Sequence, residues 1–437
     1  MSKVVKFGGS SLADANQFQK VYRIINEDKE RRYVVPSAPG KRFKDDTKVT
    51  DLLYKAYNAK TENEFRVLFN EIKQRYQDII DGLGLDFSLD EEFDVMEKNF
   101  INGLGEDYAM SRGEYLNGLL LAHYLGFAFI DAKDVIFIDQ YGKYDVQKTD
   151  EILSKRLSEV EYAVIPGFYG TLDTDDTQIK TFSRGGSDIT GAIVAKNAGA
   201  DLYENWTDVS GFLVADPRIV KNPAVIETIT YKELRELSYM GASVLHEDSV
   251  FPVRKAGIPI NIKNTNSPND PGTLIVESTC HKPSHVITGI AGTKGFATIM
   301  IEKDMMNSEI GFGRRVLQVF EEHHISFEHM PSGIDTMTII VNAEDFIDKE
   351  QDILAAIHRE VDPDSIVLES DLSLIAVVGR GMKASRGVAA KVFKALAKEN
   401  INIKMIDQGS SELNIIIGVR NCYFAPAIKA IYKEFID

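Results

Sequence analysis

The chain has 437 residues and a formal net charge of −16 at pH 7. Its 44% hydrophobic and 27% charged content fit a globular protein of roughly two or three domains, and the acidic balance, with no run of lysines or arginines, disfavours a nucleic-acid partner. No apolar run has the length of a membrane-spanning helix and the two cysteines lie far apart, so we expect a cytoplasmic protein without membrane contact.

The chain opens with a predicted buried strand that ends in a glycine turn. Residues 4–7 are apolar except for Lys6, Gly8-Gly9-Ser10 follow them, and helical spacing begins at Leu12. Backbone N–H groups and the positive end of a helix would point at such a turn, which makes it an anion site. We therefore expect phosphate binding here with Lys6 beside it, although the common G-x-x-x-x-G-K-[ST] loop is absent.

Strand and helix patterns alternate through the first part of the chain. Strands are predicted at 33–37, 127–130, 135–138, 162–166, 201–206 and 258–262, and helices at 61–80, 149–160 and 188–197. The helix at 61–80 stands between strand–helix units, so we interpret residues 58–105 as a helical insertion. The alternation predicts an α/β fold with a mostly parallel sheet sandwiched by helices, and ligands at the carboxyl ends of the strands.

A second glycine turn precedes the predicted helix at 188–197. Residues 183–188 read Ser-Arg-Gly-Gly-Ser-Asp, and Ser187 or Asp188 could simply cap that helix. Capping alone does not explain two glycines directly after Arg184. We therefore predict a second phosphate or substrate site, and the two Gly-Gly-Ser turns could face one reacting centre.

Other polar segments are open to ordinary structural interpretations. Ser111-Arg112-Gly113-Glu114 is predicted to open a helix, where Glu114 could be a common first-turn acid. Residues 206–211 and 215–218 follow a strand and are typical of loops. The histidines show no metal-ligand spacing, so no protein-bound metal centre is predicted.

The last third of the chain is an internal repeat, in which Gly311 corresponds to Gly387, 76 positions later. Each copy reads as strand, loop, helix, strand, strand, helix and strand, the βαββαβ pattern of a ferredoxin-like module. Residues 379–384 match a G-x-G-x-x-A dinucleotide fingerprint, but they lie in the second copy of the repeat. We therefore interpret them as part of that module.

In order, these motifs resemble those of the aspartate kinases, which have the amino acid kinase fold. The resemblance is carried by Lys6-Phe7-Gly8-Gly9-Ser10-Ser11, Ser111-Arg112-Gly113-Glu114, residues 183–188 and Trp206-Thr207-Asp208. The C-terminal repeat resembles the paired ACT modules of that family. The resemblance implies a catalytic domain over residues 1–280 and ACT modules over 285–365 and 366–437, a length that suits a monofunctional enzyme.

The resemblance also implies ATP- and Mg²⁺-dependent phosphorylation of the L-aspartate side chain to 4-phospho-L-aspartate, the first step toward lysine, threonine and methionine. Lys6 and Asp188 would be the catalytic residues. Aspartate would be bound by Ser37, Thr50, Glu114 (at its amino group), Arg184 (at a carboxylate) and Ser187. The nucleotide would be bound by Gly8, Gly9, Ser10, Thr207, Asp208, Asp216 and Arg218. Leu213 and Ser243 depart from the Tyr and Lys that are frequent in the family, both on the nucleotide side.

By the same resemblance, the first ACT module binds an inhibitory amino acid, lysine or threonine. The residues expected to contact it are Met306, Ser308, Phe327, Glu328, His329 and Asp335. The second copy has Lys404 where the first has Glu328. A lysine there would repel an ammonium group, so we expect the second copy to dock against the first. Exposed strand edges favour a homodimer or a larger oligomer.

Three alternatives follow from the same residues. Another amino acid kinase acting on acetylglutamate, glutamate or UMP is disfavoured by the paired C-terminal modules and by residues 111–114. A non-catalytic amino-acid sensor with a decayed kinase domain is disfavoured by the intact Lys6, Arg184 and Asp188. The third alternative is a nicotinamide-dependent enzyme that uses residues 379–384.

Overall fold

The computed structural model describes residues 1–437 except 184, 243, 244, 246, 280–282, 284, 384 and 437, and it leaves out the side chains of residues 247–249. The chain forms two compact units. The first comprises residues 1–212, 225–231 and 243–279, and the second comprises 213–224, 232–242 and 280–437. Two short segments from within the expected catalytic domain, 1–280, thus belong to the second unit.

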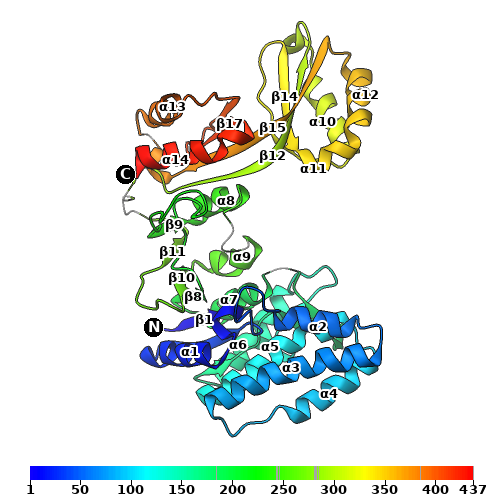
Figure 1. Ribbon diagram of the computed structural model, residues 1–437, viewed down its shortest axis with the longest axis vertical. Coiled ribbons are helices and arrows are strands. Elements are labelled where there is room, and N and C mark those ends of the chain that lie inside the picture. The colour runs from blue at the N-terminus through cyan, green and yellow to red at the C-terminus, as the bar shows by residue number, and fades with distance from the viewer. Residues whose placement is uncertain are drawn as a thin grey trace. The chain divides into compact units, whose positions relative to one another are not determined.

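An eight-stranded sheet is the centre of the first unit among the described residues, with the order β3-β5-β2-β1-β8-β10-β11-β9 (Figure 1). Its strands are β1 (Lys3–Phe7), β2 (Arg31–Pro36), β3 (Ala128–Phe129), β5 (Ala163–Val164), β8 (Leu202–Thr207), β9 (Thr228–Thr230), β10 (Ile260–Asn264) and β11 (Thr273–Val276). All neighbours pair in parallel except β10 and β11. The predicted mostly parallel sheet is therefore confirmed.

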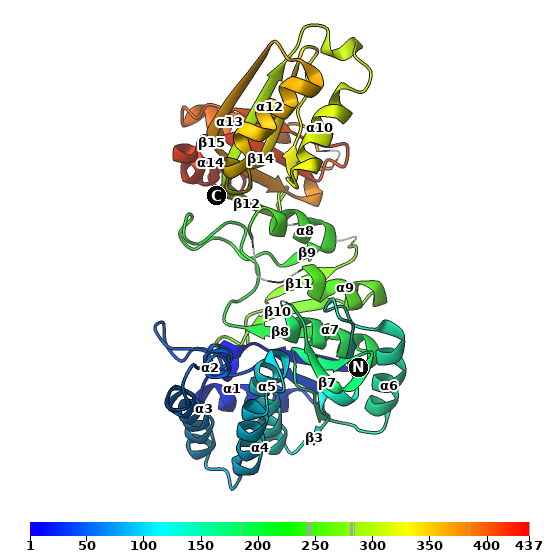
Figure 2. The same ribbon diagram turned by 90° about the vertical axis from the view of Figure 1, so that its right-hand side faces the viewer.

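Helices cover both faces of this sheet (Figures 1 and 2). One side carries α1 (Ala15–Glu27), α2 (Val49–Tyr57), α3 (Glu62–Leu83), α4 (Asp90–Ile101) and α5 (Glu106–Leu125), and the other carries α6 (Val146–Ser158), α7 (Gly186–Asn197) and α9 (Glu247–Ala256). Helix α5 packs on β2, β3 and β5, and α7 packs on β1, β2 and β8. Val5 and Phe7 of β1 lie in the core shared with α1, α3 and α5. Because side chains alternate along a strand, Lys6 faces α7.

The beginning of the chain differs from the sequence expectation in one respect. Residues Gly9–Leu12 form a single 3₁₀ turn, and α1 begins only at Ala15, where the Asp14 side chain accepts a hydrogen bond from the amide of Gln17. The glycine turn is therefore not at the start of a long helix. The first amides of the 3₁₀ turn have no partner within the turn, so these amides are the donors available to an anion.

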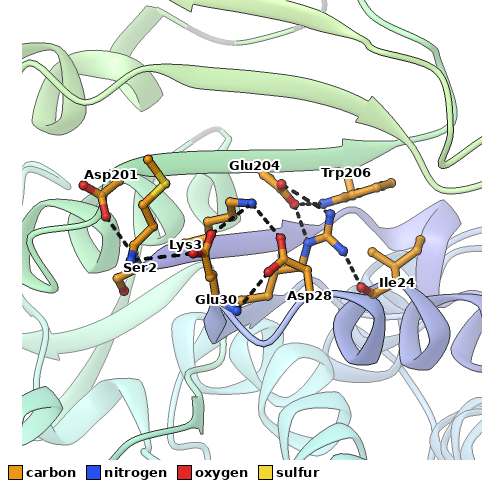
Figure 3. Close-up of polar contacts among 10 residues, drawn as sticks. Ser2, Lys3, Ile24, Asp28, Glu30, Asp201, Glu204 and Trp206 are labelled. Atoms are coloured by element: carbon orange, nitrogen blue, oxygen red, sulfur yellow. Dashed lines mark hydrogen bonds and ion pairs between the residues drawn. The ribbon is translucent and has the colours of Figure 1, made fainter.

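The end of β8 is fixed by a buried polar network (Figure 3). Glu204, only 3% exposed, accepts hydrogen bonds from the Arg31 guanidinium at 2.8 Å and from the Trp206 indole at 2.9 Å. Trp206 also stacks on Phe7 with ring centroids 6.0 Å apart. Trp206 thus anchors the strand rather than contacting a ligand, and the anchored strand positions Thr207 at its carboxyl end.

A smaller three-stranded sheet, which the sequence predicted only in its first strand, lies in the same unit. It consists of β4 (Phe137–Ile138), β6 (Tyr169–Leu172) and β7 (Asp175–Thr181). The residues of β7 are exposed or half-buried and show no alternation, which is why no strand was predicted there.

The second unit is built on a six-stranded antiparallel sheet, in the order β13-β14-β12-β15-β17-β16 among the described residues. Its elements are β12 (Gly289–Glu302), α10 (Phe312–Glu322), β13 (Phe327–His329), β14 (Thr336–Asn342), α11 (Ala343–Phe346), α12 (Glu350–Val361), β15 (Ser365–Val378), α13 (Val388–Lys398), β16 (Met405–Asp407), β17 (Asn414–Val419) and α14 (Phe424–Phe435). Helices α10 and α13 both follow a left-handed glycine, Gly311 at φ 84° and Gly387 at φ 82°. This correspondence confirms the predicted repeat.

The two copies of the repeat share their long strands. The second copy ends on α14, and the additional strand of its sheet is residues 289–294 of β12, which pair with residues 373–378 of β15. The dinucleotide-like glycines have a structural reason: a Cβ on Gly379 would lie 2.7 Å from Ile287 Cα, and one on Gly381 would lie 2.6 Å from the carbonyl oxygen of Val286.

None of the described helices is long and apolar enough to cross a membrane.

Candidate active site

A buried ion pair joins the two glycine turns of the first unit. Lys6 on β1 is 8% exposed, and its Nζ lies 2.6 Å from Oδ1 of Asp188, which stands at the start of α7. The same oxygen accepts a hydrogen bond from Nδ2 of Asn205 on β8, at 2.8 Å. The Lys6 ammonium is also close to the first turn, since a Cβ on Gly8 would lie 3.6 Å from it. The expectation that both turns serve one centre therefore has a direct geometric basis.

The first glycine turn is held by contacts that only glycine allows. The amide of Gly40 donates to the carbonyl of Gly9 at 2.8 Å. A Cβ on Gly9 would lie 2.8 Å from the carbonyl oxygen of Ala38, and one on Gly40 would lie 2.5 Å from the carbonyl carbon of Gly9. The turn is therefore packed against the loop that follows β2, backbone to backbone.

A pocket of about 550 Å³ lies between this turn and that loop. Of the residues expected to bind substrate or nucleotide, it gathers Gly8, Gly9, Ser10, Ser37, Thr50, Glu114, Thr207 and Asp208. These residues come from the ends of β1, β2 and β8 and from α2 and α5. The pocket thus lies at the carboxyl ends of parallel strands, where an α/β sheet binds its ligands.

Glu114 supplies a buried acid in the wall of this pocket. Its side chain is 5% exposed and its Oε2 has no hydrogen-bond partner. Burial raises the pKa of Glu114 to about 8, although a hydrogen bond from the backbone of Ala38 and the charges of Arg112 and Lys6 act in the opposite direction. A desolvated carboxyl group with one oxygen lacking a partner is costly to ionise unless a cation pairs with it. The pocket therefore fits a ligand with an ammonium group.

The position of Glu114 in its helix corrects the sequence interpretation. Helix α5 begins at Glu106, so Ser111 and Glu114 lie in its interior and not in its first turn. The N-terminal helix dipole therefore does not account for Glu114. Gly113, between the two polar positions, lets α5 approach the loop after β2, since a Cβ there would lie 2.8 Å from Cβ of Ala38.

Arg112 has a structural environment. Its guanidinium donates to Oγ of Ser111 at 3.1 and 3.0 Å and stacks over the rings of Tyr108, Tyr115 and Tyr169, 4.4 to 5.5 Å from their centroids. Arg112 is 5% exposed. Of the Ser-Arg-Gly-Glu segment, only Glu114 lines the pocket.

The remaining expected site residues have different surroundings. Ser187 is buried on α7 against Gly167, whose Cβ would lie 2.6 Å from it, and Arg184 lies outside the described residues. Asp216 and Arg218 belong to the second unit, where they form an ion pair at 2.7 Å. Leu213 is also in the second unit, and Ser243 lies outside the described residues.

Sequence reasoning missed several residues of the site. Asn205 contacts Asp188, and Lys41, Lys44 and Lys48 line the pocket. Because side chains alternate along β8, Asn205 and Trp206 point to opposite faces of the sheet, and this alternation could have indicated Asn205 as a site residue. No local pattern indicates that the lysines face a pocket. Among the described residues, no group of three or more His, Cys, Asp or Glu side chains could hold a metal ion.

The residues expected to bind an effector lie around β13 and the loop before α10. Met306 is buried in the core of the first module, and Asp335 accepts a hydrogen bond from the amide of Met305 at 2.9 Å. Glu328 accepts a hydrogen bond from the hydroxyl of Tyr239, and Nδ1 of His329 lies 2.7 Å from Asp407 in the second copy. Ser308 and Phe327 are exposed.

The chain belongs to the amino acid kinase family, whose model matches residues 1–264, and an ACT domain model matches residues 375–435. Within that family, its full-length relatives are aspartokinases. Aspartokinase 3 of Bacillus subtilis is 41% identical over 99% of this chain and 98% of its own length. The crystal structure of Clostridium acetobutylicum aspartate kinase is 52% identical with a TM-score of 0.89 and coverage of 99% of both chains. E. coli aspartokinase III in complex with aspartate and ADP is 24% identical with a TM-score of 0.75 and 99% coverage of both chains, a likeness of fold.

Proposed function

We propose that this protein is an aspartate kinase, which transfers the γ-phosphoryl group of ATP to the side-chain carboxylate of L-aspartate and forms 4-phospho-L-aspartate and ADP. The observation that carries the proposal is the pocket lined by both the Gly8-Gly9-Ser10 turn and Glu114, whose Oε2 has no hydrogen-bond partner, with the Lys6–Asp188 pair beside the turn. The full-length relatives named for this activity support it.

Lys6 stabilises the charge that spreads over the transferring phosphoryl group. Phosphoryl transfer is catalysed mainly by positioning and by fixed charges, and Lys6 is a buried cation beside the Gly8-Gly9 turn. The amides of Gly9 and Ser10, the first two residues of the 3₁₀ turn, are further donors, whereas the amide of Gly8 already donates to the carbonyl of Trp206 at 2.9 Å. The ion pair with Asp188 and the rigid strand β1 hold the ammonium in place before substrate binds.

Asp188 acts as a positioning residue for Lys6 and not as a general base. The nucleophile is a carboxylate with an ordinary pKa of about 3.9, so it is already ionised at neutral pH and no proton has to be removed. The Asp188 oxygen that contacts Lys6 also accepts the hydrogen bond of Asn205. Both contacts orient the carboxylate toward the lysine.

Glu114 pairs with the ammonium group of aspartate, which supplies the cation that its Oε2 lacks in the protein. Ser37 and Thr50 line the same pocket and offer hydroxyl groups to the substrate. Arg184 and Ser187, from the second glycine turn, complete the proposed aspartate site, with Arg184 on a substrate carboxylate.

Thr207 and Asp208 at the end of β8 contact the nucleotide, together with Gly8, Gly9 and Ser10. Mg²⁺ is usually held by one or two carboxylates together with substrate phosphates, so Asp208 in the pocket wall fits that need without a closed metal cage. When bound, the ion would neutralise charge on the phosphates. Asp216 and Arg218 remain proposed nucleotide contacts.

The C-terminal sheet is the proposed regulatory part. An inhibitory amino acid, with lysine favoured over threonine, binds the first copy of the repeat near Glu328 and the loop before α10. Glu328 would pair with the effector ammonium in place of Tyr239, its present partner. We place the enzyme in the cytoplasm as a homodimer or larger oligomer, at the start of lysine, threonine and methionine biosynthesis.

The test is an ADP-release assay with aspartate, glutamate, acetylglutamate and UMP as acceptors. We expect turnover with aspartate and little with the other three. Preference for another acceptor would assign the chain to a different activity of its family. Absence of ADP release with every acceptor, in a folded protein that still binds lysine, would favour the non-catalytic sensor.

A further inference from the structure

The loop between β2 and α2 is a closed, compact structure. Residues 40–48 lie between Pro39, whose carbonyl accepts the amide of Val49 at 3.2 Å, and the start of α2. A surface loop of this length whose ends meet is an Ω-loop, a type that is often functional. It forms one wall of the active-site pocket.

This loop brings three lysines to the pocket. Lys41, Lys44 and Lys48 line it together with Gly8, Gly9 and Ser10, and all three lysines are exposed. None of the three forms an ion pair within the described part of the chain. In a protein with a net charge of −16, three unpaired cations on one pocket indicate a strongly anionic ligand.

A buried arginine from the helical insertion fixes the loop. Arg75 on α3 is 3% exposed, and it donates to Asp46 at 3.0 Å, to the carbonyl of Gly40 at 2.8 Å and to the carbonyl of Thr47 at 3.1 Å. These contacts hold both ends of the loop. The insertion that the sequence set apart from the strand–helix units thus has a direct connection to the active site.

Asp46 closes the loop from inside. Its Oδ2 accepts hydrogen bonds from the amide and from Nε of Arg42, both at 2.9 Å, in addition to the bond from Arg75. Hydrogen bonding by Arg42 and the charge of Arg75 hold the pKa of Asp46 well below its usual range. The carboxylate therefore stays ionised and clasped between the two guanidinium groups.

We propose that Lys41, Lys44 and Lys48 bind the phosphates of the nucleotide in the pocket, and that Arg75 is the positioning residue that holds their loop. The assignment rests on the proposed kinase function and extends its nucleotide site beyond the glycine turn. Phosphate is favoured over the aspartate carboxylates because the lysines share the pocket with the Gly8-Gly9-Ser10 turn, and because a nucleotide triphosphate carries more negative charge than aspartate.

The first test measures ADP and AMP binding calorimetrically to wild type and to a variant with Lys41→Gln, Lys44→Gln and Lys48→Gln. Each exposed charge contact is worth a factor of about three, so ADP should bind about 30-fold more weakly, and AMP should lose clearly less. A control with Lys55→Gln, Lys60→Gln and Lys98→Gln has the same net charge and should bind as wild type does. Unchanged ADP affinity in the loop variant would overturn the proposal, as would an equal loss in the control.

Kinetics separate the two possible ligands of the lysines. In the loop variant, KM for ATP should rise, because the lost lysines would contact its phosphates. KM for aspartate should stay within about twofold, because the lysines would not contact that substrate. A rise confined to KM for aspartate would assign the lysines to the substrate carboxylate instead and overturn the phosphate assignment. If wild type does not phosphorylate aspartate but the ADP result holds, the proposed function fails while the nucleotide assignment stands.

The role of Arg75 is tested by limited trypsin digestion of Arg75→Gln and Arg75→Lys. Trypsin cleaves after lysine and arginine, so it reports whether the loop at residues 41–48 has opened. Arg75→Gln should be cut there several-fold faster than wild type, with KM for ATP raised and kcat less affected, while Arg75→Lys should recover part of the protection. Equal digestion rates with an unchanged KM for ATP would contradict the positioning role.

Discussion

A comparison of one buried glutamate from each unit, Glu114 and Glu233, shows that the same residue type can serve different purposes. Glu233 in the second unit accepts hydrogen bonds from Thr288 Oγ1 at 2.5 Å and from the amide of Arg380 at 2.7 Å, and it lies 3.0 Å from the Arg380 guanidinium. Glu114 in the first unit is also buried, at 5% exposed against 0% for Glu233, but its Oε2 has no partner. A buried carboxylate whose hydrogen bonds are satisfied within the protein has a structural role. A buried carboxyl oxygen without a partner beside a pocket indicates a ligand-binding role.

The largest effect should come from removing the ammonium group of Lys6. Lys6→Ala is expected to lower kcat by roughly two to three orders of magnitude, the loss that follows removal of a preorganised donor to a developing charge. The matched control is Lys3→Ala on the same strand, because Lys3 pairs with Asp28 at 2.6 Å at the other end of β1. Steady-state kinetics should show near-normal kcat for Lys3→Ala. Similar kcat values for the two variants would remove Lys6 from the mechanism.

Replacing the unpaired glutamate should affect substrate binding and not folding. Glu114→Gln keeps the shape of the side chain but removes its charge, so KM for aspartate should rise about 100-fold, the cost of about 2–3 kcal/mol for a lost charged contact. The urea unfolding midpoint should not fall, because a glutamine has no ionised form to desolvate. A lowered midpoint with an unchanged KM would assign Glu114 a structural role.

Replacing the paired glutamate should give the opposite result. Glu233→Gln removes the negative charge that lies 3.0 Å from the Arg380 guanidinium, and this is expected to lower the free energy of unfolding by about 3 kcal/mol. Urea unfolding followed by circular dichroism measures it, and KM for aspartate provides the comparison. If Glu233→Gln raised KM strongly at constant stability, the distinction between the two acids would be wrong.

The smallest effect should be on inhibition. The hydroxyl of Tyr239 donates a hydrogen bond to Glu328, the proposed partner of the effector ammonium. Tyr239→Phe removes this competing donor, so lysine should inhibit at a several-fold lower concentration. Glu328→Ala removes the proposed partner itself and should weaken inhibition. Lysine and threonine are titrated separately and together. Inhibition that survives Glu328→Ala but disappears in Lys404→Ala would place the effector in the other copy of the repeat.

The sequence predicted those parts of the molecule in which local patterns are strong. The apolar run before Gly8, the glycine turns and the 76-residue offset of the repeat each have a direct counterpart in the structure. The start of α5 was not predictable, because polar and apolar residues are both buried along this helix and their order shows no helical period that marks where it begins.

Long-range placement was the second limit. That Lys41 faces the pocket depends on Arg75, which reaches Gly40 from 35 residues further along the chain. That Asp216 and Arg218 belong to the second unit depends on contacts of a short segment that leaves the first unit and returns to it. Neither is encoded in a local pattern of the sequence.

The pH behaviour of Glu114 follows from its surroundings. Burial raises its pKa to about 8, so below that pH the empty site holds a proton and above it a carboxylate. A proton and the substrate ammonium therefore compete for the same group. KM for aspartate should therefore fall as pH rises from about 6.5 and level off only above pH 8, where Glu114 is mostly ionised.

The most direct test of the account is the number of protons released when aspartate binds at pH 7, measured calorimetrically in buffers of different ionisation enthalpy. Because Glu114 is mostly protonated in the empty site and must ionise to pair with the ammonium, wild type should release about one proton per aspartate bound and Glu114→Gln should release close to none. Binding by wild type without proton release, or equal release by Glu114→Gln, would contradict the claim that the unpaired glutamate is the aspartate site.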